Sequence, residues 1–515
     1  MNNWKSRVWN RITNTDKLAF ILAMISGVLT HLYALTNKLP TFDDLMCLNS
    51  FGGGVSLGRW FLEILGLLKH KLFGNYSTPS INGLLSIFFI AIAAGLFCRI
   101  LGLESRKSVV AVSILLPIFP VMTGYMAFVY TAYYYCFAMV LLLAGVWLIQ
   151  KKKSWCWNVI GCVIVSFSIG IYQAYLPLYI TLLLCALWIQ SLSEENASEV
   201  LKTGFRYLLD IAVALFFYFA GNIIMQKLLH VSMSDMKGGD RIGSVLLEKG
   251  FSIVPYIYGT FGELITGNYY GLTGKVWLQY AIALLYAITI ALLGIAIIGS
   301  FKKRKVGMAI LQIIIALLLP LGIHSLYAMV EKEYFYTLML YVEVMIFILP
   351  VMLLEHIEIN NLFTRVCSIL CTVCILLASC LYVVQDNAAY VEMDLAMSAA
   401  KSYYTTLITQ IKSMEGYKPT YPVVVVGNVD DPTLYDLRSE YFGDVAIGGT
   451  YGSTEAVNGM YLDLFLKQYC GYNQQITRDI VDMDKQALEQ MPCYPENGSI
   501  LVANESIIVK LSNEY

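Results

Sequence analysis

The sequence predicts an α-helical polytopic membrane protein with about eleven transmembrane helices, followed by a small extracytoplasmic α/β domain. Of the 515 residues, 58% are hydrophobic and 14% are charged, against averages of about 45–50% and about 25% in soluble domains. Residues 1–384 carry 27 Lys and Arg and 18 Asp and Glu, whereas residues 385–515 carry 8 and 18. This composition excludes a disordered chain, and the lack of a basic excess excludes a nucleic-acid-binding protein. We therefore predict a basic membrane domain over 1–384 and an acidic domain over 385–515.

Eleven windows are apolar enough to cross a bilayer, for which a helix needs about 20 mostly apolar residues. The first window is not a cleavable signal peptide, because it is long enough to span and no small-residue cleavage site follows it. The third is short and contains Pro117 and Pro120, so we expect a kink there. The windows are 18–36, 83–103, 108–123, 128–149, 157–173, 175–192, 207–229, 276–298, 306–329, 334–353 and 366–384.

The positions of Lys and Arg predict the orientation, since cytoplasmic loops carry an excess of both. With the N-terminus in the cytoplasm, 17 of them fall in inside loops and ten in outside loops. The C-terminus, the segment 385–515 and the loops 37–82 and 230–275 then lie outside. The inside loops are short and contain no Gly-rich nucleotide motif. Any chemistry is therefore expected on the outer face.

The first outer loop, 37–82, carries the best candidates for chemistry. It contains the adjacent carboxylates Asp43 and Asp44, and then Gly58–Arg59–Trp60. Partial desolvation at a membrane boundary makes a carboxylate a better base, although an Asp pair can also only cap a helix or solvate a loop. Residues 59–73 have the helical amphipathicity of a surface helix with an interfacial Trp, and they are too short and polar for a span. Arg59 suits phosphate oxygens, but it could also only snorkel to lipid headgroups.

Three segments in this order resemble the serotype-converting O-antigen glucosyltransferases, the glucosyltransferase-II-like family. They are TFDDL at 41–45, GRW at 58–60 and SIGIYQAY at 168–175. The similarity covers about residues 10–380. It implies a GT-C-type enzyme of the bacterial cytoplasmic membrane, which moves a hexose, expected to be glucose, from polyprenyl phosphate to a surface glycan such as O-antigen. An acidic residue of the first outer loop would activate the acceptor hydroxyl.

By position, the resemblance assigns the role of base to Asp43 or Asp44, with a preference for Asp44. Direct attack by the acceptor on the anomeric carbon would invert its configuration. A cation should stabilise the departing lipid phosphate, and we expect this of Arg59. The family also implies a functional link to a flippase and to a polyprenyl-phosphate glucosyl synthase. No cofactor is indicated, and whether a divalent metal assists stays open.

Further polar residues on the predicted outer face are weaker candidates. Tyr172 and Gln173, at a tight turn, could hydrogen-bond a sugar, or the tyrosines there could form an aromatic belt. His324 and Glu343 lie inside predicted spans, where ionisable residues are functional candidates, although a neutral His bonded between helices is an equal alternative. Cys470 and Cys493 are predicted to form a disulfide. The candidates for substrate binding are Arg59, Trp60, Tyr172, Gln173, Glu331 and Glu333, with Asp240 and Arg241 in the loop 230–275.

The C-terminal domain is predicted to be a small α/β unit that recognises the acceptor or covers the membrane site. The alternative function for the whole chain is a transporter or flippase of a lipid-linked or polar solute. We find no internal repeat of the kind that transporters show. A glycan polymerase or ligase and a non-catalytic sensor explain the first outer loop less well. The expected elements are helices over 395–413, 455–470 and 484–491 and strands in 419–428, 499–503 and 507–511.

Overall fold

The computed structural model describes residues 13–39, 44–45, 54–74, 77–151, 154–234, 244–267, 269–332, 335–357, 361–429, 462–478 and 485–513. The chain divides into two compact units. Unit 1 comprises residues 1–36, 51–74 and 78–386. Unit 2 comprises residues 37–50, 75–77 and 387–515. The sequence had placed the whole loop 37–82 with the membrane domain, whereas its segments 37–50 and 75–77 group with the C-terminal part of the chain.

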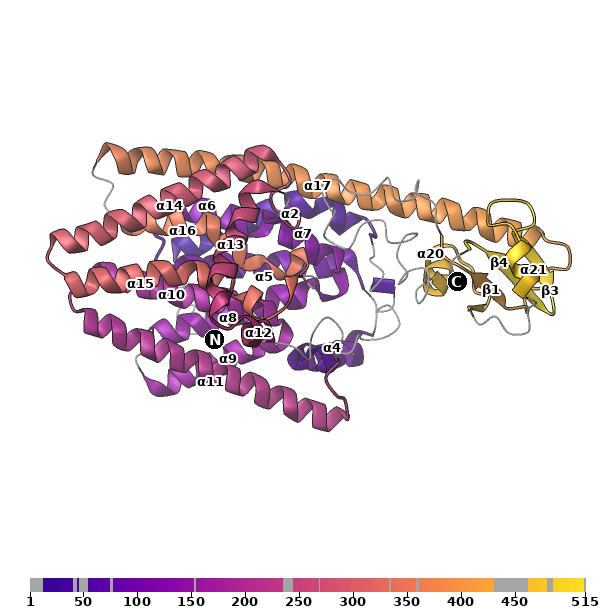
Figure 1. Cartoon of the computed structure of the whole chain (residues 1–515), viewed down its shortest axis with the longest axis horizontal. Coiled ribbons are helices and arrows are strands. Elements are labelled where there is room, and N and C mark those ends of the chain that lie inside the picture. The colour runs from indigo at the N-terminus through magenta and orange to yellow at the C-terminus, as the bar shows by residue number, and fades with distance from the viewer. Residues whose placement is uncertain are drawn as a thin grey trace, which may run out of the picture. The chain divides into compact units, whose positions relative to one another are not determined.

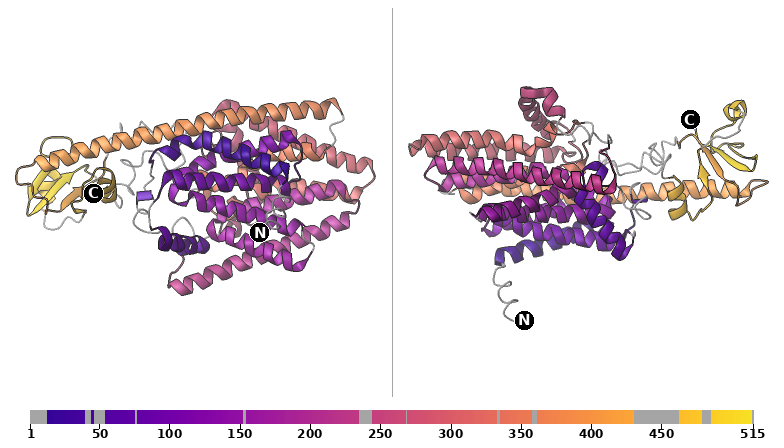
Figure 2. Two further views of the ribbon diagram at one scale, coloured as in Figure 1. Left: turned by 180° about the vertical axis from the view of Figure 1, so that it is seen from behind. Right: turned by 90° about the horizontal axis from the view of Figure 1, so that it is seen from below.

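Unit 1 is a bundle of long helices that run side by side (Figures 1 and 2). Among the described residues, nine helical segments are long and apolar enough to cross a membrane. α9 has only 17 residues, so the count of eleven spans stays a prediction. The helices of the bundle are α2 (Asn14–Thr36), α5 (Pro79–Ile100), α6 (Arg106–Ile118), α7 (Pro120–Ala127), α8 (Val129–Lys151), α9 (Trp155–Ile171), α10 (Leu176–Ser193), α11 (Ala197–Leu229), α14 (Val276–Lys302), α15 (Val306–Ile323), α16 (Met345–His356) and α17 (Leu362–Ser413).

The predicted kink in the third span is a full break between α6 and α7. Phe119 is extended (φ −66°, ψ 131°), as the residue before a proline usually is. Pro120 has no N–H, so the Leu116 carbonyl loses its helical donor. The Tyr341 hydroxyl replaces that donor at 2.5 Å, and His31 Nε2 lies 2.7 Å from the carbonyl oxygen of Pro117. Side chains of other helices thus satisfy backbone groups that a membrane would leave without partners.

A second irregular stretch replaces the end of the predicted span 306–329 and the first half of the predicted span 334–353. It consists of the 3₁₀ turns η5 (Ser325–Ala328), η7 (Thr337–Met339) and η8 (Tyr341–Val344), followed by the short helix α16. α7 packs against η7, and a Cβ on Gly124 would lie 3.5 Å from the side chain of Leu338. The short helix that follows the break thus meets the irregular stretch in the interior of the bundle, and membrane proteins tolerate such irregular backbone where it is buried or lines a site.

The loops 37–82 and 230–275 contribute short elements to unit 1. In the first, η1 (Val55–Leu57) is followed by α4 (Trp60–Phe73), which lies at one end of the bundle (Figure 1). α4 confirms the helix predicted over 59–73. In the second, α12 (Ser244–Lys249) and η4 (Gly250–Ser252) precede α13 (Ile253–Thr266), which packs against α14 and α15.

Unit 2 has a four-stranded sheet in the order β2–β1–β4–β3. β1 (Val423–Val426) pairs in parallel with β2 (Ile476–Thr477) and with β4 (Ser506–Lys510), and β4 pairs antiparallel with β3 (Ile500–Ala503). The end of α17, α20 (Leu462–Tyr469) and α21 (Lys485–Gln490) complete it. Lys510 is buried, and its Nζ donates to the carbonyls of Leu488 and Met491 at 2.9 and 2.7 Å, which satisfies the end of α21. The sequence missed only β2 among these elements, because two residues carry no strand pattern.

Candidate functional site

The Gly58–Arg59–Trp60 motif forms a tight turn at the start of α4. Gly58 has φ +74°, and a Cβ there would lie 2.7 Å from Tyr218 Oη and 2.8 Å from Gln173 Nε2. Both groups clamp the turn, since Gln173 Nε2 donates to the Leu57 carbonyl at 2.6 Å and Tyr218 Oη donates to the Gly58 carbonyl at 3.1 Å. Glycine is therefore required here for its backbone angle and for its lack of a side chain. Gln173, a predicted sugar contact, holds this turn.

Trp60 lies inside unit 1 and not at the predicted interface. Its side chain is 6% exposed and stacks edge-on against Phe167 of α9, with the centroids 5.7 Å apart. A Cβ on Gly170 would lie 2.8 Å from the indole, and one on Gly221 would lie 2.6 Å from it. The two glycines of α9 and α11 thus make the space that the indole fills. Trp60 anchors α4 to the bundle and thereby fixes Arg59, which precedes it.

Arg59 lies against a group of buried tyrosines. Its Nη1 donates to the Tyr135 hydroxyl at 3.2 Å, and its guanidinium lies 5.5 Å from the centre of the Tyr172 ring. The two rings stack on each other with centroids 4.3 Å apart. This cation–π and hydrogen-bonded setting fixes the direction of the guanidinium. Arg59 and Tyr172, which the sequence predicts separately as site residues, therefore lie together.

The tyrosines around Arg59 are interior residues, so their alternative interpretation as an aromatic belt is wrong for them. They are all at most 4% exposed. The Tyr125 hydroxyl donates to the Tyr175 hydroxyl at 3.1 Å, and Tyr175 donates to the Tyr135 carbonyl at 2.9 Å. Tyr172 Oη is buried without a hydrogen bond among the described residues. We call this the arginine–tyrosine cluster; it contains Arg59, Tyr125, Tyr135, Tyr172, Tyr175 and Tyr341.

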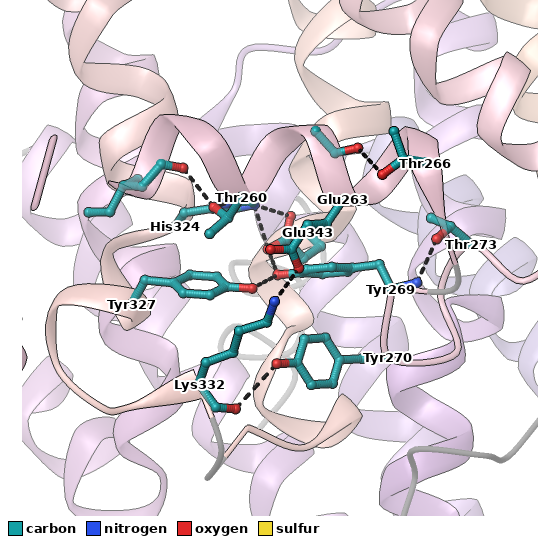
Figure 3. Close-up of polar contacts among 12 residues, drawn as sticks. Thr260, Glu263, Thr266, Tyr269, Tyr270, Thr273, His324, Tyr327, Lys332 and Glu343 are labelled. Carbon is teal, nitrogen blue, oxygen red and sulfur yellow. Dashed lines mark hydrogen bonds and ion pairs between the residues drawn. The ribbon is translucent and has the colours of Figure 1, made fainter. Parts of the chain in front are cut away.

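His324 and Glu343, which the sequence marked one by one, form a buried acid–base pair (Figure 3). Their side chains are 0% and 2% exposed, and His324 Nε2 lies 2.9 Å from Glu343 Oε1. The other ring nitrogen lies 2.6 Å from Thr260 Oγ1 of α13. Tyr269 donates to Glu343 at 3.5 Å and shares a hydrogen bond of 2.8 Å with Tyr327. Phe261 stacks on the imidazole with centroids 3.7 Å apart. We call these residues the histidine–glutamate cluster.

The histidine–glutamate cluster ties the 253–273 segment to the irregular stretch 324–344. Beside it, Lys332 Nζ pairs with Glu263 Oε2 at 2.6 Å, and Tyr270 donates to the Lys332 carbonyl at 3.3 Å (Figure 3). Glu331 is half-buried beside this pair. Glu333, like Asp240 and Arg241, lies outside the described residues, so its predicted role stays a prediction. One 3₁₀ turn, η8, carries both Tyr341 and Glu343 and so joins the two clusters.

Asp44, the preferred base, lies in unit 2. It is 2% exposed, and burial together with the Asp44 carboxylate raises the pKa of the nearby Tyr469 phenol. Lys38 Nζ lies 4.6 Å from the centre of the Tyr469 ring. The next residue, Leu45, is fully buried in the core of unit 2, and its carbonyl accepts from Gln468 at 2.8 Å. Asp43 lies outside the described residues.

The described part of the chain contains neither the predicted disulfide nor a cluster of metal ligands. Cys470 and Cys493 are free thiols, so the predicted disulfide is absent. Burial raises the pKa of Cys470, which makes that thiol less reactive. No group of three or more His, Cys, Asp and Glu that could hold a metal occurs among the described residues. The residues present therefore suggest no metal centre there.

Sequence reasoning missed two contributors to this region. Tyr218, in the middle of α11, gave no signal, because a single Tyr in an apolar helix is common. Asp386 lies on α17, two residues beyond the last predicted span, and is 1% exposed. Its signal was available, since a carboxylate directly after an apolar window lies close to the membrane boundary. It was hidden by the acidic composition of the residues that follow.

The comparison with known proteins gives one match. A family model described as Glucosyl transferase GtrII matches residues 32–354. The match includes Asp44 and both clusters of unit 1. No curated protein and no solved structure matches the chain. Together with the nine apolar helices found in the described part of the chain, the match indicates a membrane glycosyltransferase.

Proposed function

We propose that this chain, which belongs to the Glucosyl transferase GtrII family, transfers a hexose from a polyprenyl-phosphate donor to a surface glycan. Glucose is the expected sugar. The proposed place is the outer face of the bacterial cytoplasmic membrane, with the N-terminus inside and the C-terminus outside. The observation that carries the proposal is the fixed guanidinium of Arg59 inside the segment that matches the family. The acceptor class and the coupled flippase and glucosyl synthase are part of this proposal.

The reaction needs a base, for which Asp44 is the preferred residue. The acceptor hydroxyl attacks the anomeric carbon, the bond from that carbon to the phosphate oxygen breaks, and the proton passes to a carboxylate. Attack opposite the leaving group inverts the anomeric carbon. The burial of Asp44 supports this role, because few water molecules then compete for its oxygens. Asp43 is the second candidate.

The leaving polyprenyl phosphate carries negative charge, which Arg59 is suited to stabilise. Tyr135 and Tyr172 hold its guanidinium in place before the substrate arrives, so little reorganisation is required during the reaction. The fork of N–H donors matches two phosphate oxygens. We assign the roles of Arg59 and Asp44 independently of each other.

The test follows release of polyprenyl phosphate from polyprenyl-phosphate-glucose by the full-length protein in nanodiscs, with crude surface glycan as acceptor. Asp44→Asn should lower release about 10²–10⁴-fold, the usual contribution of a general base. Asp463→Asn is the matched control, since Asp463 is an exposed carboxylate on α20 of the same unit. Asp43→Asn is measured in parallel.

The outcomes separate the candidate functions. Loss of release with Asp44→Asn but not with Asp463→Asn supports Asp44 as the base. Loss with Asp43→Asn alone moves the role to Asp43, and survival of both variants moves it to Glu331 or Glu333. If the protein binds the lipid but releases no polyprenyl phosphate, the enzyme proposal fails and the flippase alternative is favoured.

A further inference from the structure

Asp386 is a buried carboxylate that the proposed reaction does not use. It is 1% exposed, and its Oδ2 has no hydrogen-bond partner among the described residues. Burying an acceptor without a partner is costly, more so when it is charged. Asp210 on α11 is similarly buried at 5% exposure. Asp210 Oδ2 also has no hydrogen-bond partner among the described residues. Arg206, one helical turn before it, compensates its charge, whereas no described cation pairs with Asp386.

The surroundings of Asp386 hold its side chain at the broken third span. The hydroxyl of Thr123 on α7 lies beside the carboxylate and bonds to it. Thr123 is 3% exposed. One turn earlier on α17, Tyr382 packs edge-on against Phe119, with centroids 5.7 Å apart. The neighbouring residue Gln385 donates to the Gly271 carbonyl. Asp386 is thus fixed beside Thr123, and its Oδ2 has no hydrogen-bond partner among the described residues.

Nearly all buried polar groups in proteins have partners, so Asp386 Oδ2, which has none among the described residues, indicates a polar ligand. A carboxylate only accepts hydrogen bonds, and a threonine hydroxyl both donates and accepts. Neighbouring hydroxyls of a sugar ring can donate to Asp386 Oδ2 and to Thr123 Oγ1. A divalent cation fits less well, because Ca²⁺ takes six to eight oxygen ligands and Mg²⁺ six, and the described residues hold no cluster of metal ligands.

We propose that Asp386 and Thr123 form a subsite that binds hydroxyl groups of a hexose ring. The ring is either the sugar that is transferred or the sugar that receives it. The inference rests on the proposed function and deepens it, because it adds residues that bind the sugar to those that act on the phosphate and the proton. Asp386 lies outside the segment that matches the family model.

The test combines variants with deoxy sugars. Wild type and Asp386→Asn are compared with polyprenyl-phosphate-glucose and with its 2-, 3-, 4- and 6-deoxy analogues, by equilibrium binding and by release. A site built to bond a hydroxyl rejects the analogue that lacks it, so wild type should lose at least about 100-fold with one analogue. Asp386→Asn should have lower activity than wild type with the glucose donor. Its activity with that deoxy analogue should be little lower than its own activity with glucose. Thr123→Val should show the same pattern for the same or the adjacent hydroxyl.

Controls keep the outcomes distinct. Asp210→Asn should keep the full deoxy-sugar discrimination of wild type, and thermal unfolding in the same nanodiscs shows that each variant is folded. If the donor series is unchanged but Asp386→Asn raises the KM for the surface glycan, the subsite holds the acceptor sugar. If a folded Asp386→Asn keeps every preference and that KM, or loses equally with all sugars, the proposal is wrong. If wild type releases no polyprenyl phosphate, the proposed function is refuted. Equilibrium binding of the same deoxy-sugar donors then still tests whether Asp386 and Thr123 bind a sugar.

Discussion

The histidine–glutamate cluster and the Asp386–Thr123 pair are both buried and polar, but they differ in how completely they are satisfied. In the first, both ring nitrogens of His324 have hydrogen-bond partners, and Glu343 also accepts a hydrogen bond from the Tyr269 hydroxyl. In the second, Asp386 bonds to Thr123 through one oxygen only, and its Oδ2 has no partner among the described residues. A satisfied buried network rigidifies a fold, whereas an unsatisfied one is a cost that binding can offset. We infer that the first holds the structure and that the second serves a ligand.

The largest expected effect is on stability, from breaking the closed cluster. His324→Phe keeps an aromatic ring against Phe261 but removes the imidazole partner of the buried Glu343 carboxyl group. Removing one member of a buried pair costs about 3–5 kcal/mol, so the free energy of unfolding should fall by that amount. The double variant His324→Phe/Glu343→Leu should recover most of it. Thermal unfolding in detergent measures both, and a double variant as unstable as the single would show that the pair is not the coupled unit.

Arg59 should affect activity more than stability. Arg59→Ala should lower the rate of polyprenyl phosphate release about 10²–10³-fold, as the loss of one preorganised donor to a developing charge does. The rate for Arg59→Lys should lie between those of wild type and Arg59→Ala, because the ammonium keeps the positive charge but lacks the paired N–H donors of the guanidinium. Lys71→Ala, an exposed cation on the same helix, is the control. Equal rates for Arg59→Ala and wild type would leave Arg59 as a packing residue.

The indole of Trp60, next to Arg59, is closely packed against α11, and a single added methyl group can disturb this packing. In Gly221→Ala the new Cβ would lie 2.6 Å from the Trp60 ring, and such overpacking costs about 1–3 kcal/mol. Gly294→Ala on α14 is the matched control, because no atom lies within 4 Å of a Cβ there. Unfolding temperatures should fall for the first and stay level for the second. Equal temperatures would mean that the indole can move aside.

The smallest effect should come from the open pair. Asp386→Asn removes a carboxylate that has no described cation beside it, so the free energy of unfolding should stay level or rise by up to about 1 kcal/mol. The contrast with His324→Phe is the direct measure of the difference between the two sites. If Asp386→Asn lowered the free energy of unfolding by about 3 kcal/mol or more, Asp386 would be needed for the fold, and this would count against the sugar subsite.

The sequence predicted the helical elements well, because apolar windows and prolines act locally. Pro120 indicated the break before α7, and the spacing of charged residues indicated α4. The sequence also selected His324, Glu343, Arg59 and Tyr172, but not their pairing, since contacts between distant helices leave no mark in a single chain. The predicted span 334–353 was wrong as one helix, because its apolar composition hides 3₁₀ turns fixed by partners such as Glu343. Asp386 was missed because the acidic composition of the residues that follow hid a carboxylate directly after an apolar window.

Leu45 sets a limit on how far this protein can be taken apart. Its side chain is part of the core of unit 2, together with Tyr404 of α17 and Phe465 of α20. A chain cut after residue 386 would therefore remove the residues that hold the Asp44 segment, along with the C-terminal domain. Exchange of C-terminal domains between related chains would have to carry residues 37–50 with residues 387–515. The second domain is thus not a separable module, since two distant stretches of sequence must be inherited together.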